Sequence, residues 1–171
     1  MGKTLLILLS VGLASVLRAD VTNVVAVAEL GRIGTGTSAD GWELTDVSNY
    51  SESYKYALKI NKNSCRVVSP EYATAVVGVT LKTISSSQAD RRLALIPIAE
   101  GVALTDLMFR CAYSPKNYSA TVQSIAWPAE LKARRFEIRL DGSGSTGWGV
   151  QELSVITSDP PPRRGFRIHV Q

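Results

Sequence analysis

Residues 135–140 read Arg-Phe-Glu-Ile-Arg-Leu, with an apolar side chain at every second position. Successive side chains of a β-strand point to opposite faces of a sheet, so this pattern is typical of a strand that buries one face. The same alternation recurs on both sides of this stretch. It covers residues 56–60, 65–68, 75–82, 93–98, 108–113, 149–155 and 166–171. The chain is therefore predicted to be all-β.

Turn-forming residues separate these runs. Gly, Ser and Asn gather in the stretches 31–41, 47–55, 85–91, 114–119 and 141–149. Only residues 129–133, which follow Trp127-Pro128, look able to form a helical turn. About ten short strands with spacers of this kind indicate a β-sandwich or a β-barrel.

The N-terminus has the pattern of a secretory signal peptide. A single cation, Lys3, precedes an almost wholly apolar run from residue 5 to residue 17, and Ala19 supplies the small residue of a cleavage site. The apolar run is shorter than the about 20 residues that a transmembrane helix needs. We therefore predict a cleaved leader at 1–19 and no permanent membrane span. The mature chain is expected to be secreted, periplasmic or held at the cell surface.

The remainder has the length of one domain with its own core. We assign this domain to residues 20–157, and assign residues 158–171 to a proline-rich spacer followed by a terminal strand. The chain carries 19 basic and 15 acidic residues, with the basic ones spread along its length. Nucleic-acid binding usually needs a clustered basic face, so the composition argues against a nucleic-acid partner.

Three segments together resemble the bacterial jelly-roll domains of the galactose-binding-like and carbohydrate-binding-module-like kind. They are Gly41-Trp42-Glu43-Leu44, the strand–turn–strand of 56–72 that ends in Ser-Pro-Glu-Tyr, and the pair of runs at 135–140 and 149–155. The resemblance covers about residues 21–157 and consists of hydrophobic patterns. It implies a two-sheet antiparallel jelly-roll β-sandwich, with a tendency to bind ligands at loops or on a sheet face.

Aromatic residues in loops are the candidate ligand contacts, because sugar rings stack their apolar faces on Trp and Tyr. Trp148 lies in a stretch rich in Gly and Ser and is the leading candidate. Tyr118, Tyr54 and Trp127 also fall in loops or at a strand end. Packing in the core is the alternative for each of them, and Trp42 is expected to plug one end of the sandwich.

The resemblance also suggests a structural calcium ion, which such domains often hold between their first and last strands. Glu29 and Glu152 fall in the corresponding segments, and calcium accepts carboxylate oxygens. Two surface carboxylates without a metal are the alternative. Cys65 and Cys111 would permit a disulfide in an exported chain, or they are two separate buried thiols. No other cofactor is expected.

The sequence offers few residues for acid–base or nucleophilic catalysis. His169 is the sole histidine and lies two residues from the end, which is a poor place to hold a general base. The glycine spacing of residues 142–147 matches a dinucleotide-binding loop, yet a strand pattern follows it instead of the required helix. We therefore predict a non-enzymatic module that recognises a carbohydrate through loop aromatics. The alternative is a structural or adhesive cell-envelope protein whose partner is another protein.

Overall fold

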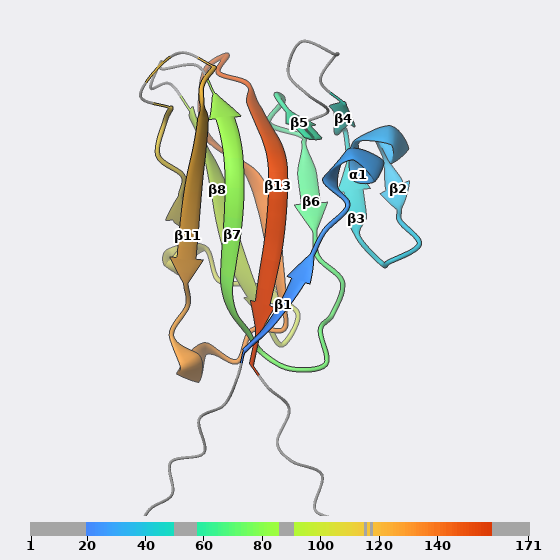
Figure 1. Ribbon diagram of the computed structural model, residues 1–171, viewed down its shortest axis with the longest axis vertical. Helices are drawn as coiled ribbons and strands as arrows, with labels where there is room; N and C mark the ends of the chain where they lie inside the picture. The colour runs from blue at the N-terminus through green and yellow to red at the C-terminus, as the bar shows by residue number, and fades with distance from the viewer. Residues whose placement is uncertain (1–19, 50–57, 86–90, 115, 117, 159–171) are drawn as a thin grey trace, which may run out of the picture.

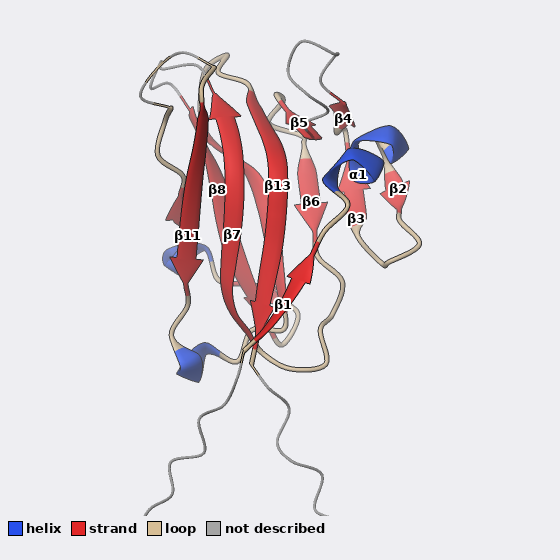
Figure 2. Ribbon diagram, in the orientation of Figure 1, coloured by secondary structure: helices blue, strands red, loops and turns tan. Residues whose placement is uncertain are grey.

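The computed structural model describes residues 20–49, 58–85, 91–114, 116 and 118–158 (Figure 1). Strands dominate these ranges, and two antiparallel sheets face each other (Figure 2). The predicted all-β, two-sheet antiparallel jelly-roll sandwich is therefore confirmed. The predicted leader at 1–19, Tyr54 and the segment 159–171 lie outside the described residues. Within the described ranges, no helix has the length and apolar character needed to cross a bilayer.

The first sheet has the strand order β11-β7-β13-β5-β4, and β1 also pairs with β13. Its central strands are the longest of the sheet. The bounds are β1 (Val21–Val24), β4 (Ser48–Asn49), β5 (Leu58–Ile60), β7 (Val76–Ser85), β11 (Ala120–Ala126) and β13 (Trp148–Thr157).

The second sheet has the order β10-β8-β12-β6-β3-β2, and β9 also pairs with β8. The strongly alternating runs near 93–98 and 135–140 form its two long strands. The bounds are β2 (Gly36–Thr37), β3 (Glu43–Thr45), β6 (Arg66–Val68), β8 (Arg91–Ala99), β9 (Val102–Ala103), β10 (Phe109–Arg110) and β12 (Arg135–Gly142).

The core fills the space between the sheets. Leu81 and Leu153 of the first sheet and Leu95 of the second are fully buried members of one apolar cluster. Phe136 of β12 packs against the ring of Trp42, with 5.8 Å between ring centroids and 78° between ring planes. Such edge-to-face contacts are favourable for aromatic pairs. Trp42 is therefore a packing residue, as the sequence predicted.

Helix α1 (Val27–Ile33) was not expected from the sequence, which placed Glu29 in the first strand. Val27, Leu30 and Gly31 are its buried residues, and their i, i+3, i+4 spacing puts them on one helix face. Because Gly31 has no side chain, the helix can approach Asn49 of β4 closely: a Cβ at Gly31 would lie 1.9 Å from Asn49 Oδ1. The helix is too short for its periodicity to be distinct from that of a strand.

Strand β11 was also missed, because a polar residue interrupts its apolar alternation. Gln123 occupies an inward position, and its side-chain amide accepts a hydrogen bond from Ala112 N at 2.6 Å. The same amide donates to Ala112 O at 3.3 Å and to Thr83 Oγ1 at 3.1 Å. These hydrogen bonds satisfy the polar groups of Gln123 and link the edge of the first sheet to the segment that follows β10.

The expected helical turn at 129–133 is present as a short 3-10 helix, η3 (Ala129–Leu131). A second one, η2 (Thr105–Leu107), follows β9.

Cys65 and Cys111 are both buried and both free, so the disulfide that the sequence permitted is not formed. Cys65 directly precedes β6 and Cys111 directly follows β10, with β8 and β12 between them in the sheet. Three strand spacings amount to about 14 Å, whereas a disulfide needs α-carbons within about 7 Å. Burial raises the pKa of Cys111 to about 12, so its thiol is protonated at neutral pH.

Candidate binding site

Trp148 is fully buried, so the exposure expected for this residue is wrong. The strand β13 begins at Trp148, where it pairs with both Ile60 of β5 and Ser85 of β7. The indole ring lies 5.5 Å from the ring of Tyr113 and its Nε1 donates to the backbone oxygen of Arg91 at 3.1 Å. The glycine-rich loop before it therefore ends earlier than the sequence suggested, and the side chain points between the sheets.

Of the other expected aromatics, the two that the structure describes are not brought together. Trp127 is 8% exposed and packs 5.7 Å from Phe136. Tyr118 is 47% exposed, with its backbone N bonded to Ser85 O. Trp127 N bonds to Val77 O, so these two aromatic residues lie at opposite ends of β7. They cannot form one stacking platform.

The carboxylates expected to hold calcium are used differently. Glu152 is paired with Lys82 on the neighbouring strand, with 2.7 Å from Nζ to Oε1. Glu29 lies on α1 and not on a strand. Among the described residues, no group of three or more His, Cys, Asp or Glu side chains is placed to hold a metal.

Two adjoining surface hollows lie beside the hairpin of β2 and β3. Their volumes are about 310 and 320 Å³, and both are lined by Val25, Ala26, Asp40 and Trp42. We call this pair of hollows the Asp40 trough. Glu29, Arg32, Ile33 and Ser38 extend it on one side, and Asn23, Val24, Pro70 and Tyr72 extend it on the other.

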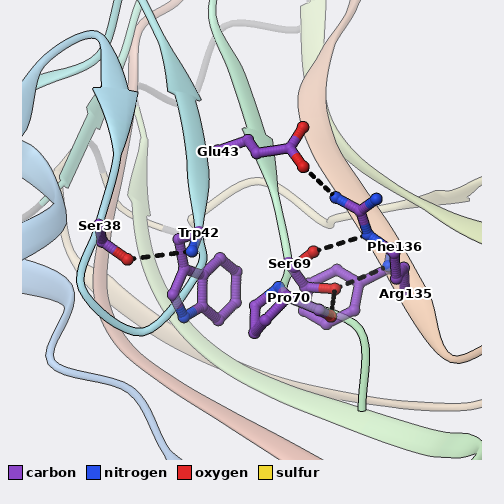
Figure 3. Close-up of polar contacts among 7 residues, drawn as sticks. All are labelled: Ser38, Trp42, Glu43, Ser69, Pro70, Arg135 and Phe136. Atoms are coloured by element: carbon purple, nitrogen blue, oxygen red, sulfur yellow. Dashed lines mark hydrogen bonds and ion pairs between the residues drawn. The ribbon is translucent and has the colours of Figure 1, made fainter.

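A tight turn places Asp40 at the rim of the trough. Ser38 Oγ accepts a hydrogen bond from Trp42 N at 3.0 Å (Figure 3). In the backbone, Ser38 N donates to Trp42 O at 2.8 Å. Gly41 has a φ of 81°, which a glycine adopts without strain. The turn is therefore held by its own hydrogen bonds and by the buried indole of Trp42, and the Asp40 side chain is exposed.

Ser69 fixes the floor next to Trp42. Its Oγ accepts from the backbone N of Phe136 at 3.0 Å, and its carbonyl accepts from Arg135 Nε at 3.0 Å (Figure 3). Arg135 also pairs with Glu43 on β3 at 2.6 Å. These contacts fix the position of Pro70, which lines the far end of the trough together with Tyr72.

Tyr72 contributes a phenol to the trough. It is half-buried against the core, and burial raises its pKa to about 12. The hydroxyl is therefore neutral at physiological pH and can both donate and accept a hydrogen bond. On the opposite wall, Val24 is 83% exposed and supplies apolar surface.

The charged residues of the trough differ in their ion pairing from those on the outer face of the second sheet. Within the described part of the chain, no ion pair or side-chain hydrogen bond engages Glu29, Arg32 or Asp40. Each acid on the sheet face has an arginine partner: Glu43 with Arg135, Glu137 with Arg66, and Asp141 with Arg110. The charged groups of the trough are thus free to contact a ligand. Sequence reasoning missed these residues, because the trough joins segments from β1, α1 and the β2–β3 turn.

The chain matches no protein-family model and no curated protein. Several solved structures are similar to this chain at low sequence identity. The carbohydrate-binding module CBM36 in complex with calcium and xylotriose is 13% identical, with a TM-score of 0.45 over 70% of this chain and 96% of the module. A family 29 carbohydrate-binding module is 13% identical, with a TM-score of 0.46 over 80% of this chain and 93% of that one. A similar match, at 13% identity and a TM-score of 0.41, is to the Agl-KA catalytic domain, of which only 26% is covered.

Proposed function

We propose that this protein is a carbohydrate-binding module and that the Asp40 trough holds the sugar. One observation carries the proposal: Glu29, Arg32 and Asp40 line the same open trough with no ion-pair partner among the described residues, while each acid of the sheet face has an arginine partner. Binding sites for small polar molecules combine apolar walls with a few polar groups that fix orientation. The trough has both, with Val24, Val25 and the ring of Tyr72 as apolar surface.

Each polar group has a role in this proposal. The Asp40 carboxylate accepts hydrogen bonds from sugar hydroxyls, and the Arg32 guanidinium donates to ring or hydroxyl oxygens. The neutral phenol of Tyr72 serves as donor or acceptor at the other end. Hydrogen bonds to charged groups contribute about 1.5–3 kcal/mol each. Asp40 lines both hollows whereas Arg32 lines one, so Asp40 is the group whose loss should weaken binding most.

The proposal concerns binding alone, without cleavage of the glycan, and it replaces the loop aromatics by the trough as the main contact. Tyr118 remains a candidate for a second, more distant contact because it is exposed. The sequence pattern at 1–19 supports a secreted, periplasmic or cell-surface location, where such a module would meet polysaccharides.

The test compares Asp40→Ala with Asp106→Ala in the leader-free chain. Asp106 is an exposed acid in η2, outside the trough, so its loss changes the net charge equally. Retardation in gels that contain neutral soluble polysaccharides, and calorimetry with their oligosaccharides, measure binding. We expect the original chain and Asp106→Ala to bind a member of the panel, and Asp40→Ala to bind it about 10- to 100-fold more weakly. Equal binding by both variants, or no binding by the original chain to any neutral glycan, would refute the proposal.

A further inference from the structure

The outer face of the second sheet carries a cluster of arginines. Leu93 and Leu95 of β8 and Ile138 of β12 belong to the core. The residues between and beside them therefore point outward. Beside the ion pair of Arg135 with Glu43, this surface carries four guanidinium groups and two carboxylates, which we call the arginine face: Arg66, Arg92, Arg110, Arg139, Glu137 and Asp141.

The register puts three of these arginines in one row across the sheet. Arg139 of β12 lies directly opposite Arg66 of β6 and, on its other side, opposite Ala94 of β8. Ala94 in turn lies opposite Arg110 of β10. Two strand spacings place the backbones of Arg110 and Arg139 about 10 Å apart. Like charges directly opposite each other on neighbouring strands destabilise a sheet, so the pair formed by Arg66 and Arg139 requires compensation.

The protein supplies only part of that compensation. Glu137 is 8% exposed and lies 2.8 Å from Arg66 Nε, but 3.6 Å from Arg139 Nη1. Asp141 is engaged by Arg110 Nε at 2.5 Å. Four arginines against two carboxylates leave this face with a net charge of +2.

Arg139 leaves most of its hydrogen-bonding capacity unused. Its 3.6 Å pairing with Glu137 is the nearest polar contact it makes within the described residues. A guanidinium has five N–H donors, and they match the oxygens of an oxyanion well. Its neighbour in the row, Ala94, is small and places no polar group between Arg139 and Arg110. Ala94 is itself fully buried, so an oxyanion would lie at the surface between the two guanidinium groups, within the span of both.

We propose that the arginine face binds the carboxylate or sulfate groups of an acidic polysaccharide. This inference rests on the proposed carbohydrate-binding function and adds a second surface, distinct from the Asp40 trough, that selects charged glycans. Duplex nucleic acid fits the face less well. It presents a negative charge about every 1.7 Å along its axis, and the interspersed Glu137 and Asp141 would repel so dense a charge.

The experiment compares Arg139→Gln with Lys82→Gln. Lys82 lies on β7 in the other sheet, where it forms an exposed pair with Glu152, so both variants lose one positive charge. Retardation of the leader-free chain is measured in gels that contain dextran sulfate, polygalacturonate or uncharged dextran, at two salt concentrations. Dextran sulfate reports on sulfate and polygalacturonate on carboxylate. We expect salt-sensitive retardation by at least one of the acidic polymers, weakened about tenfold in Arg139→Gln and unchanged in Lys82→Gln.

Several results would overturn this inference. They are the absence of retardation by both acidic polymers, equal weakening in the two variants, and binding of duplex DNA at least as tight as that of the acidic polymers. Arg139→Gln removes one of two opposed like charges, so we expect the variant to fold, and its thermal unfolding checks this. The proposed function fails separately, through the comparison of Asp40→Ala with Asp106→Ala on neutral glycans. Retardation that Arg139→Gln weakens and Asp40→Ala leaves unchanged would support the arginine face alone.

Discussion

Replacement of Trp148 is expected to damage the fold and to leave the ligand-binding surface unchanged. The indole is fully buried at the start of β13, next to Tyr113, and donates one hydrogen bond to Arg91 O. Truncation of a buried aromatic residue to Ala costs about 3–5 kcal/mol, because it removes apolar contacts and leaves a cavity. We expect Trp148→Ala to lose stability in this range.

Trp148→Phe separates the hydrogen bond from the packing. The substitution removes the N–H donor, but Arg91 O still accepts a hydrogen bond from the Tyr113 hydroxyl at 3.0 Å. The carbonyl is therefore not left without a partner, and the lost bond costs about 1 kcal/mol. The smaller ring adds a cavity worth about 1 kcal/mol more, at about 24 cal/mol for each Å³. We expect a total loss of about 2 kcal/mol, clearly less than for Trp148→Ala.

Urea unfolding of residues 20–171, followed by far-ultraviolet circular dichroism, measures both changes in the free energy of unfolding. The same proteins are assayed for glycan binding below their unfolding transition. We expect folded Trp148→Phe to bind as the original chain does, because its side chain is not exposed. Two outcomes would contradict the structure: loss of less than about 1 kcal/mol in Trp148→Ala, or loss of glycan binding by fully folded Trp148→Phe.

Two further predictions concern close packing and the thiols. An Ala in place of Gly usually stabilises a helix, but the Cβ added by Gly31→Ala would lie 1.9 Å from Asn49 Oδ1. We therefore expect the free energy of unfolding, measured in urea, to fall by about 1–3 kcal/mol. A rise in this free energy would contradict the contact. Cys65 and Cys111 should resist alkylation in the native protein at pH 8, since both are buried and Cys111 has a pKa of about 12. In urea without reductant, mass spectrometry should find both thiols modified, whereas failure to modify them would indicate a disulfide.

Alternating apolar residues were enough to predict the sandwich. Phe136, Ile138 and Leu140 must all be buried together, and only a strand places every second side chain on one face. The exceptions have local causes. In α1, Val27 and Leu30 are too few to show a helical period, and in β11 the inward residue Gln123 is polar. The sequence therefore determined which segments bury one face, provided that the segment is long and its buried residues are apolar.

The tertiary structure alone decided which of the candidate side chains are exposed and what lies beside them. Whether Trp148 is exposed depends on β5 and β7, which lie on either side of it, and these strands come from distant parts of the chain. The row that sets Arg139 opposite Arg66 likewise depends on the register of β12 with β6. A periodic pattern says that a side chain points inward or outward, but not which partner lies opposite. That partner is fixed by the register of strands that are distant in the chain. The register is the one that buries the apolar residues of all the strands together.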